Sequence, residues 1–156
     1  MKARKSRLLI VDASVVCSAG ETAFRTSSSC RACLEAILHI CHRVAVTGPI
    51  LDEWNRHMSR FSRKWRRFMA GKKKPIKTIA PAAVSLDIEA FSGPAREQIE
   101  KDLILLAAAL AADRIIVTRD DRLKAALMTH GDGAAVLNAI RWVNPVADGP
   151  KALHDL

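Results

Sequence analysis

Four acidic residues lie beside strongly apolar stretches of the sequence, where an uncompensated charge is costly. Asp12 ends the run "LLIV", Glu53 comes shortly after "VAVT", and Asp120 follows "RIIVT". Asp102 opens the segment "DLILLAAALAA". If these carboxylates meet, they repel one another and raise one another's pKa values unless a cation lies between them. Ligands that are all oxygen favour Mg²⁺ or Mn²⁺ over zinc, so the four acids are candidate metal ligands and catalytic residues.

The elements that must position these acids alternate between strand and helix along the chain. Apolar runs predict strands over 7–11, 43–47 and 114–118, and a last strand within "LNAIRWVNP". Helical spacing and caps predict helices over about 27–42, 49–70, 93–112 and 120–130, while 75–87 favours a short strand or an extended crossing. This order predicts a single domain over 1–156: a Rossmann-like three-layer α/β/α sandwich around a mostly parallel sheet.

In such a sheet the carboxyl ends of the strands share one edge, and ligands bind beyond it. Asp12 and Asp120 then fall at this edge, with Glu53 and Asp102 on the helices beside it, and the predicted topology places no cation among them. Each acid also has a simpler interpretation. Asp12 and Asp120 are suited to helix caps, and Asp102 to the helix dipole. Glu53 is suited to a solvated helix face, with Asp52 as the acid that matters.

Composition narrows the class of partner. The chain has 156 residues, a hydrophobic content of 49% and a net charge of +9. A chain this basic attracts phosphate backbones or anionic surfaces. The apolar run after "MKARKS" is too short for a signal peptide, and no stretch reaches the ~18 residues of a membrane span. We therefore expect a cytoplasmic protein with no membrane association.

Four cysteines fall in the first third of the chain, and Cys30, Cys33, Cys41 and His42 allow a zinc interpretation. The alternative is that cysteines pack as small apolar residues on one helical face, which comprises Cys30, Cys33, Leu34, Ile37, Ile40 and Cys41. We favour packing, because no second closely spaced pair of ligands follows.

The most basic part of the chain follows Glu53. It contains nine cations and no acid: Arg56, Arg60, Arg63, Lys64, Arg66, Arg67, Lys72, Lys73 and Lys74. Such a run predicts salt-dependent contacts with a nucleic-acid backbone. Trp65 and Phe68 either stack on bases or, as we favour, belong to the apolar face of the helix.

The stretches "LLIVDAS", "VTGPILDEW", "DLILLAAALAADRIIVTRDD" and "IRWVNP" resemble the PIN domain family, metal-dependent ribonucleases that include the toxins of VapBC-type systems. The resemblance covers nearly the whole chain, and the spacing from Asp102 to "VTRD" is its most specific part. It implies a catalytic cluster of Asp12, Glu53, Asp102 and Asp120, with Asp121 as a further candidate. It also implies Mg²⁺ or Mn²⁺, RNA as substrate, a homodimer and an antitoxin partner.

The expected function is hydrolysis of phosphodiester bonds in single-stranded RNA by a metal-dependent endoribonuclease. Thr118, just before the last acid, is placed to donate a hydrogen bond to a phosphate or a ligand, or is an ordinary strand residue. Two alternatives stay open: a PIN-like module that binds RNA or protein without cleavage, and a DNA-directed nuclease of related fold. A pure binder gains nothing from clustered negative charge facing phosphate, which favours the nuclease.

Overall fold

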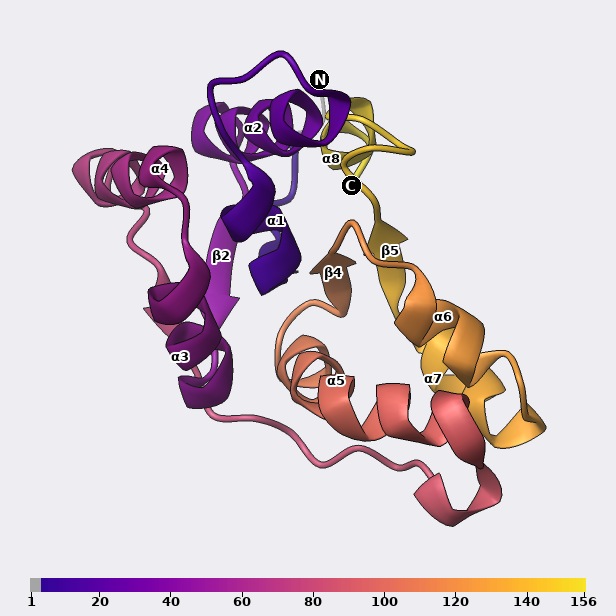
Figure 1. Cartoon of the computed structure of the whole chain (residues 1–156). Helices are drawn as coiled ribbons and strands as arrows, with labels where there is room; N and C mark the ends of the chain where they lie inside the picture. Colours follow the sequence, from indigo (N-terminus) through magenta and orange to yellow (C-terminus); the bar gives the residue numbers. More distant parts are fainter. Residues whose placement is uncertain (1–3) are drawn as a thin grey trace.

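A computed structural model describes residues 4–156 and has a five-stranded parallel sheet at its centre (Figure 1). The strand order is β3-β2-β1-β4-β5, and all four strand pairs are parallel. The strands are β1 (Leu8–Val11), β2 (Arg43–Val46), β3 (Lys77–Thr78), β4 (Ile115–Val117) and β5 (Arg141–Val143). The predicted α/β fold class is confirmed, and the four expected strands are present.

The central strand β1 is covered on both faces, which explains its unbroken apolar sequence. Leu9 pairs with Val44 of β2, and Ile10 pairs with both Ala45 of β2 and Ile116 of β4. All of these side chains are fully buried in the core. The buried sheet holds the carboxyl end of β1 rigidly beside that of β4.

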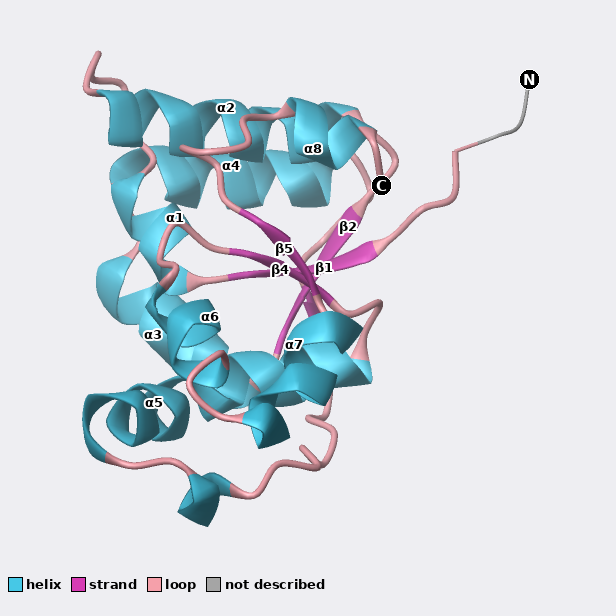
Figure 2. Ribbon diagram, turned by 90° about the vertical axis from the view of Figure 1, so that its right-hand side faces the viewer, coloured by secondary structure: helices cyan, strands magenta, loops and turns pink. Residues whose placement is uncertain are grey.

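Helices pack on both sides of the sheet and complete three layers (Figure 2). One layer contains α2 (Arg25–His39), α4 (Arg60–Gly71) and α8 (Lys151–His154), and the other contains α5 (Gly93–Ala111), α6 (Arg122–Leu127) and α7 (Ala134–Ala139). Two more helices, α1 (Ala13–Ser18) and α3 (Gly48–His57), begin two residues after β1 and β2. Both therefore start at the carboxyl edge of the sheet.

The strand order reverses between β1 and β4. From β1 the chain moves to β2 and then β3 on one side, whereas β4 leads to β5 on the other. Such a switch point opens a crevice at the carboxyl ends of the two strands, because their connections depart in opposite directions. Asp12 and Thr118, the residues that directly follow β1 and β4, lie at this point.

The helix predicted over 49–70 is wrong in one respect, because the structure has two helices there. Met58 ends α3, and Ser59 begins α4 as an N-cap whose hydroxyl accepts a hydrogen bond from the Ser62 amide at 3.1 Å. The Ser59 amide and hydroxyl also bond to the carbonyls of Val16 and Ala19. This elbow, Met58–Ser59, is thus fixed against α1, and apolar spacing alone does not reveal it.

Other boundaries also differ from the sequence prediction. Helix α2 begins at Arg25 with Phe24 as its N-cap, so the expected serine cap at 27–29 is wrong. The short α1, α7 and α8 were not predicted, since helices of four to six residues show too little periodicity. No helix within 4–156 is long and apolar enough to cross a membrane.

The cysteines pack largely as expected. Cys30 and Cys33 are fully buried on α2 together with Leu34 and Ile37. Burial raises the pKa of Cys30 to about 11 and that of Cys33 to about 12, so both thiols stay protonated. Cys41 lies beyond the helix end and is exposed, which corrects its expected place on the apolar face.

Candidate functional site

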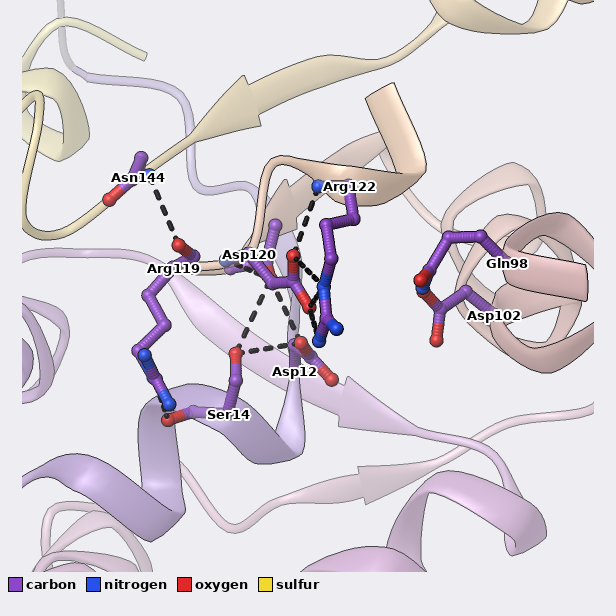
Figure 3. A network of polar contacts seen from close by, with 9 residues as sticks. Asp12, Ser14, Gln98, Asp102, Arg119, Asp120, Arg122 and Asn144 are labelled. Atoms are coloured by element: carbon purple, nitrogen blue, oxygen red, sulfur yellow. Dashed lines mark hydrogen bonds and ion pairs between the residues drawn. The ribbon is translucent and has the colours of Figure 1, made fainter. Parts of the chain in front are cut away.

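Asp12 continues the ladder of the sheet and turns its carboxylate toward the switch point. Its amide donates to the Val117 carbonyl at 2.9 Å, so the backbone is fixed between β1 and β4. One carboxylate oxygen accepts hydrogen bonds from the hydroxyls of Ser14, at 2.7 Å, and Thr118, at 2.8 Å (Figure 3). Asp12 is the N-cap residue of α1 but makes no side-chain cap bond. The helix-cap interpretation of Asp12 is therefore wrong.

Thr118 joins two of the acids. Its side chain is 3% exposed, and its hydroxyl donates to Asp12 while accepting from the Asp120 amide at 3.1 Å. Its amide donates to the Val143 carbonyl of β5 at 2.9 Å, which fixes the backbone. Sequence alone favours an ordinary strand residue at this position, but the structure shows Thr118 donating to a candidate ligand, Asp12, and so orienting its carboxylate.

Asp120 is paired with a cation from its own loop. Arg122 donates through Nε to both Asp120 carboxylate oxygens at 2.9 Å and through Nη2 to Oδ2 at 2.6 Å. The Arg122 amide also donates to Oδ1 at 3.0 Å, but the N-cap residue of α6 is Asp121, so the helix-cap interpretation of Asp120 is wrong. These contacts hold the pKa of Asp120 below its usual range.

Asp102 and Glu53 approach from helices on either side of the crevice. Asp102 lies in the middle of α5, well beyond the first turn, so the helix dipole does not explain it. Its half-buried carboxylate accepts a hydrogen bond from Gln98 one turn earlier. Burial, and then the charges of Asp12 and Asp120, raise the pKa of Asp102. Glu53 on α3 is also half-buried.

One pocket of about 240 Å³ gathers these groups. Ten residues line it: Asp12, Ala13, Ser14, Glu53, Arg56, His57, Lys101, Asp102, Asp120 and Arg122. All four predicted acids are among them, but so are three permanently cationic side chains. The expectation that no cation lies among the acids is therefore wrong. Arg122 follows Asp120 by two residues and Lys101 precedes Asp102, so both cations are brought in by the elements that carry the acids.

The donor set is chemically suited to Mg²⁺ or Mn²⁺, because its four acids offer only oxygen. Within 4–156, however, no three Asp, Glu, His or Cys side chains stand close enough together to form a ready cation site. The contacts of Asp120 account for part of this spacing, since Arg122 already engages both of its oxygens. The pocket thus contains suitable ligands in an arrangement that a cation would have to draw together.

Two neighbouring acids lie outside this pocket. Asp121 lines an adjoining hollow and accepts a hydrogen bond from Asn144 at 3.3 Å, so the structure does not bring it to the other four. Asp52 is exposed and does not line the pocket, whereas its neighbour Glu53 does. The structure therefore places Glu53, and not Asp52, beside Asp12.

The predicted basic stretch is divided by the elbow at Met58–Ser59. Arg56, on α3, lines the acid pocket. The cations of α4 and the following turn lie beyond the elbow, and most of them are exposed: Arg60, Arg63, Lys64, Arg67, Lys72 and Lys73. Arg66 is half-buried and donates to Asn55 at 3.4 Å.

Lys74 has a structural role that removes it from the predicted RNA-binding set. Its ammonium group donates to the carbonyls of Ile37, at 2.5 Å, and Ile40, at 2.6 Å, and so caps the C-terminal end of α2. Trp65 is buried and donates to the Leu34 carbonyl, which confirms its place on the apolar face. Phe68 is 59% exposed, so its expected place on the apolar face is wrong.

The sequence analysis missed four residues that line the pocket, namely Ser14, His57, Lys101 and Arg122, and one that donates to Asp102 from beside it, Gln98. Ser14 lies two residues after Asp12, and Gln98 lies four residues before Asp102 on the same helix, so spacing could have indicated both. The pairing of Arg122 with Asp120 depends on the loop conformation and has no comparable pattern.

No protein-family model matches this sequence, and no curated protein matches it. Inference about function therefore depends on the geometry of the pocket and on the motifs. Chemically, the pocket offers carboxylates that can hold a divalent cation and guanidinium or ammonium groups that can contact an anion beside it. This combination suits a phosphate ester better than a neutral ligand.

Proposed function

We propose that this chain is a metal-dependent endoribonuclease of the PIN type, acting on single-stranded RNA. The observation that carries the proposal is the meeting of Asp12, Glu53, Asp102 and Asp120 in one pocket at the switch point of a parallel sheet. These residues come from four separate segments of the chain. Half-buried acids gathered at one edge repel one another, which does not favour the fold, whereas a metal-dependent hydrolase uses such a set to hold its cation.

In this proposal Asp12 and Asp102 hold the metal, and Glu53 and Asp120 complete its surroundings or hold a second ion. Bound Mg²⁺ or Mn²⁺ supplies Lewis acidity and activates water for in-line hydrolysis of a phosphodiester. Ser14 and Thr118 keep the Asp12 carboxylate in one orientation. Arg56 and Lys101 line the pocket and offset the charge of the substrate phosphate, which four acids alone would repel.

The experiment combines metal binding and cleavage in purified full-length protein. We expect Mn²⁺ to raise the melting temperature, because a ligand that binds only the folded state stabilises it. A mixed panel of single-stranded RNAs should be cleaved with Mg²⁺ or Mn²⁺ and protected by EDTA. Asp12→Asn, which keeps the shape of the side chain and removes its charge, serves as the matched control.

The remaining outcomes separate the alternatives. RNA binding without cleavage in either metal would favour a binding module, and preferential cleavage of single-stranded DNA would favour a DNA-directed nuclease. No thermal shift at millimolar Mn²⁺ in folded protein would contradict the metal site itself. The mass of the purified protein in solution tests the proposed homodimer. A small neighbouring gene that encodes a DNA-binding pattern would support the proposed antitoxin partner.

A further inference from the structure

The pair of Asp120 and Arg122 is the most completely bonded contact in the pocket. Four hydrogen bonds join the two residues, three from the guanidinium and one from the backbone amide. The guanidinium therefore occupies both oxygens of a carboxylate that the proposed function assigns to the metal. These four bonds use the roughly four lone-pair sites of the carboxylate, so a cation that takes both oxygens competes with the guanidinium for them.

The same pair is easily separated. The Arg122 side chain is 70% exposed, whereas that of Asp120 is 26% exposed. Surface ion pairs contribute modestly to stability, and a bidentate pair lies at the upper end of that range, because water and salt compete for the exposed guanidinium. Arg122 can therefore leave Asp120 without disturbing the fold, and its backbone amide can keep Oδ1 in place when the guanidinium departs.

We propose that Arg122 is a placeholder cation: it holds Asp120 until the metal binds, and the displaced guanidinium then contacts the phosphate of the substrate. This inference rests on the proposed function, since it gives Arg122 a role at the same site. Arg122 lines the pocket together with Asp12 and Asp102, so a short rotation of its side chain keeps it beside the bound ligand. A planar guanidinium forms two parallel hydrogen bonds with a phosphate, which suits it to the second position.

The geometry also explains why the four acids do not form a ready cation site. Asp120 is turned toward Arg122 of its own loop, and Asp102 is turned separately toward Gln98 of its own helix (Figure 3). Metal binding would exchange one positive charge for another on Asp120. The pocket would then gain a guanidinium for the incoming phosphate at the moment the metal arrives.

The test measures Mn²⁺ affinity by titration in the wild type, Arg122→Gln and Arg119→Gln. Arg119 is the matched control, because it is an exposed arginine of the same loop whose Nε donates to the Ser14 carbonyl, whereas the guanidinium bonds to Asp120 come from Arg122. Loss of either charge changes the general attraction of the metal similarly, but only Arg122→Gln frees the oxygens. We expect Arg122→Gln to bind Mn²⁺ about fivefold more tightly than Arg119→Gln, the range of an exposed ion pair.

RNA cleavage at saturating Mn²⁺ supplies the second measurement. We expect Arg122→Gln to cleave about tenfold or more slowly than the wild type, because the phosphate has lost a charged donor. A merely damaged site would lose metal affinity and activity together, whereas the proposal requires them to move in opposite directions.

Equal Mn²⁺ affinity in the two variants, with a wild type that binds Mn²⁺, would overturn the placeholder role and leave the proposed function standing. Tighter metal binding with unimpaired cleavage would overturn the contact with phosphate. A folded wild type that binds no Mn²⁺ would overturn this inference and the proposed metal site together.

Discussion

Two hydroxyl groups orient Asp12, and one of them, that of Thr118, also contacts a second acid. Thr118 is buried, donates to the Asp12 carboxylate and accepts from the Asp120 amide, so it sets the relative position of two acids. Its partners come from the ends of β1 and β4, which makes the hydroxyl a bridge across the switch point. Valine has nearly the same shape and offers neither contact.

We therefore predict that Thr118→Val retains the fold and loses most of the activity. The substitution leaves the Asp120 amide without its partner and the Asp12 carboxylate with Ser14 as its only hydroxyl donor, which costs about 1–3 kcal/mol of the free energy of unfolding. Cleavage should fall about tenfold, as expected for a misplaced ligand. Urea unfolding and initial rates measure both effects, and Thr118→Ser should restore them. Wild-type rates in Thr118→Val would show that the hydroxyl has no positioning role.

Asp102 differs from Thr118, because we expect it to be needed for cleavage without stabilising the fold. Burial and the charges of Asp12 and Asp120 raise its pKa, which means that the ionised carboxylate is disfavoured in the folded protein without a cation. Asp102→Asn should thus leave the melting temperature unchanged or higher, while cleavage falls by about two orders of magnitude or more.

Asp52→Asn provides the comparison for this variant, because Asp52 is an exposed acid outside the pocket. We expect it to resemble the wild type in both measurements. Activity of Asp102→Asn within a few-fold of the wild type would place the chemistry elsewhere. A large fall in its melting temperature would instead give Asp102 a structural role.

At the scale of elements, the elbow at Met58–Ser59 separates the two parts of the basic stretch. Arg56 remains with the acid pocket, whereas the cations of α4 lie on a helix that Trp65 and Met69 anchor in the core. Helix α4 carries no acid from Arg60 to Gly71. Arg60, Lys64 and Arg67 are exposed, and their spacing of four and three residues places them on one face.

We predict that neutralising this face weakens RNA binding and flattens its dependence on salt. Changing Arg60, Lys64 and Arg67 to Gln removes three phosphate contacts, so the slope of log affinity against log salt should fall by about two. Mn²⁺ affinity should hardly change, since the acids lie on other elements. Affinities measured by anisotropy at several salt concentrations test this.

The control variant changes three other exposed cations to Gln: Arg43, Arg141 and Lys151. Arg43 and Arg141 begin β2 and β5, so they lie at the amino ends of the strands, away from the acid pocket. These changes should leave the salt slope close to that of the wild type. An unchanged slope in the α4 variant would show that its cations are a solvated face. Loss of partner binding with unchanged RNA affinity would make the face a protein-docking surface.

At the scale of the whole molecule, the sheet and the placement of the four acids were open to prediction, because both follow from pattern. Buried parallel strands such as "LLIV" and "RIIVT" are uniformly apolar, and a parallel sheet brings their carboxyl ends to one edge. The break between α3 and α4 at Ser59 could not be predicted, and neither could the pairing of Arg122 with Asp120, since both depend on local backbone geometry. Lys74 was misjudged because sequence alone does not show that the end of α2 lies within its reach.

His42 connects three distant parts of the fold and makes stability depend on pH. Its Nδ1 accepts from the Arg7 amide at 3.1 Å, and its Nε2 donates to the Leu153 carbonyl at 2.9 Å, a pattern that requires the neutral ring. Burial is the largest cause of its lowered pKa, assisted by the nearby charges of Lys74, Arg7 and Arg4. The unfolded chain therefore binds this proton more readily than the folded chain.

It follows that His42 contributes stability in full above its ordinary pKa of about 6.5, and that this contribution is lost as pH falls below that value. Urea unfolding at a series of pH values from neutral to mildly acidic should show the decline. His42→Asn should be less stable at neutral pH by about 1–3 kcal/mol and should show a shallower decline. An equally steep decline in that variant would assign the pH dependence to other groups.

The hydrogen bond between Asp12 and Thr118 joins two residues that the ribosome adds at very different times. The two side chains are 106 positions apart in sequence, and the fourth acid follows Thr118 by two residues. A chain emerging from the ribosome holds its first acid long before the strand that completes the pocket exists. Under the proposed function, unfinished or prematurely terminated chains would be harmless to the RNA around them, including the message being translated. Cleavage would begin only after the segment through Asp120 had been synthesised.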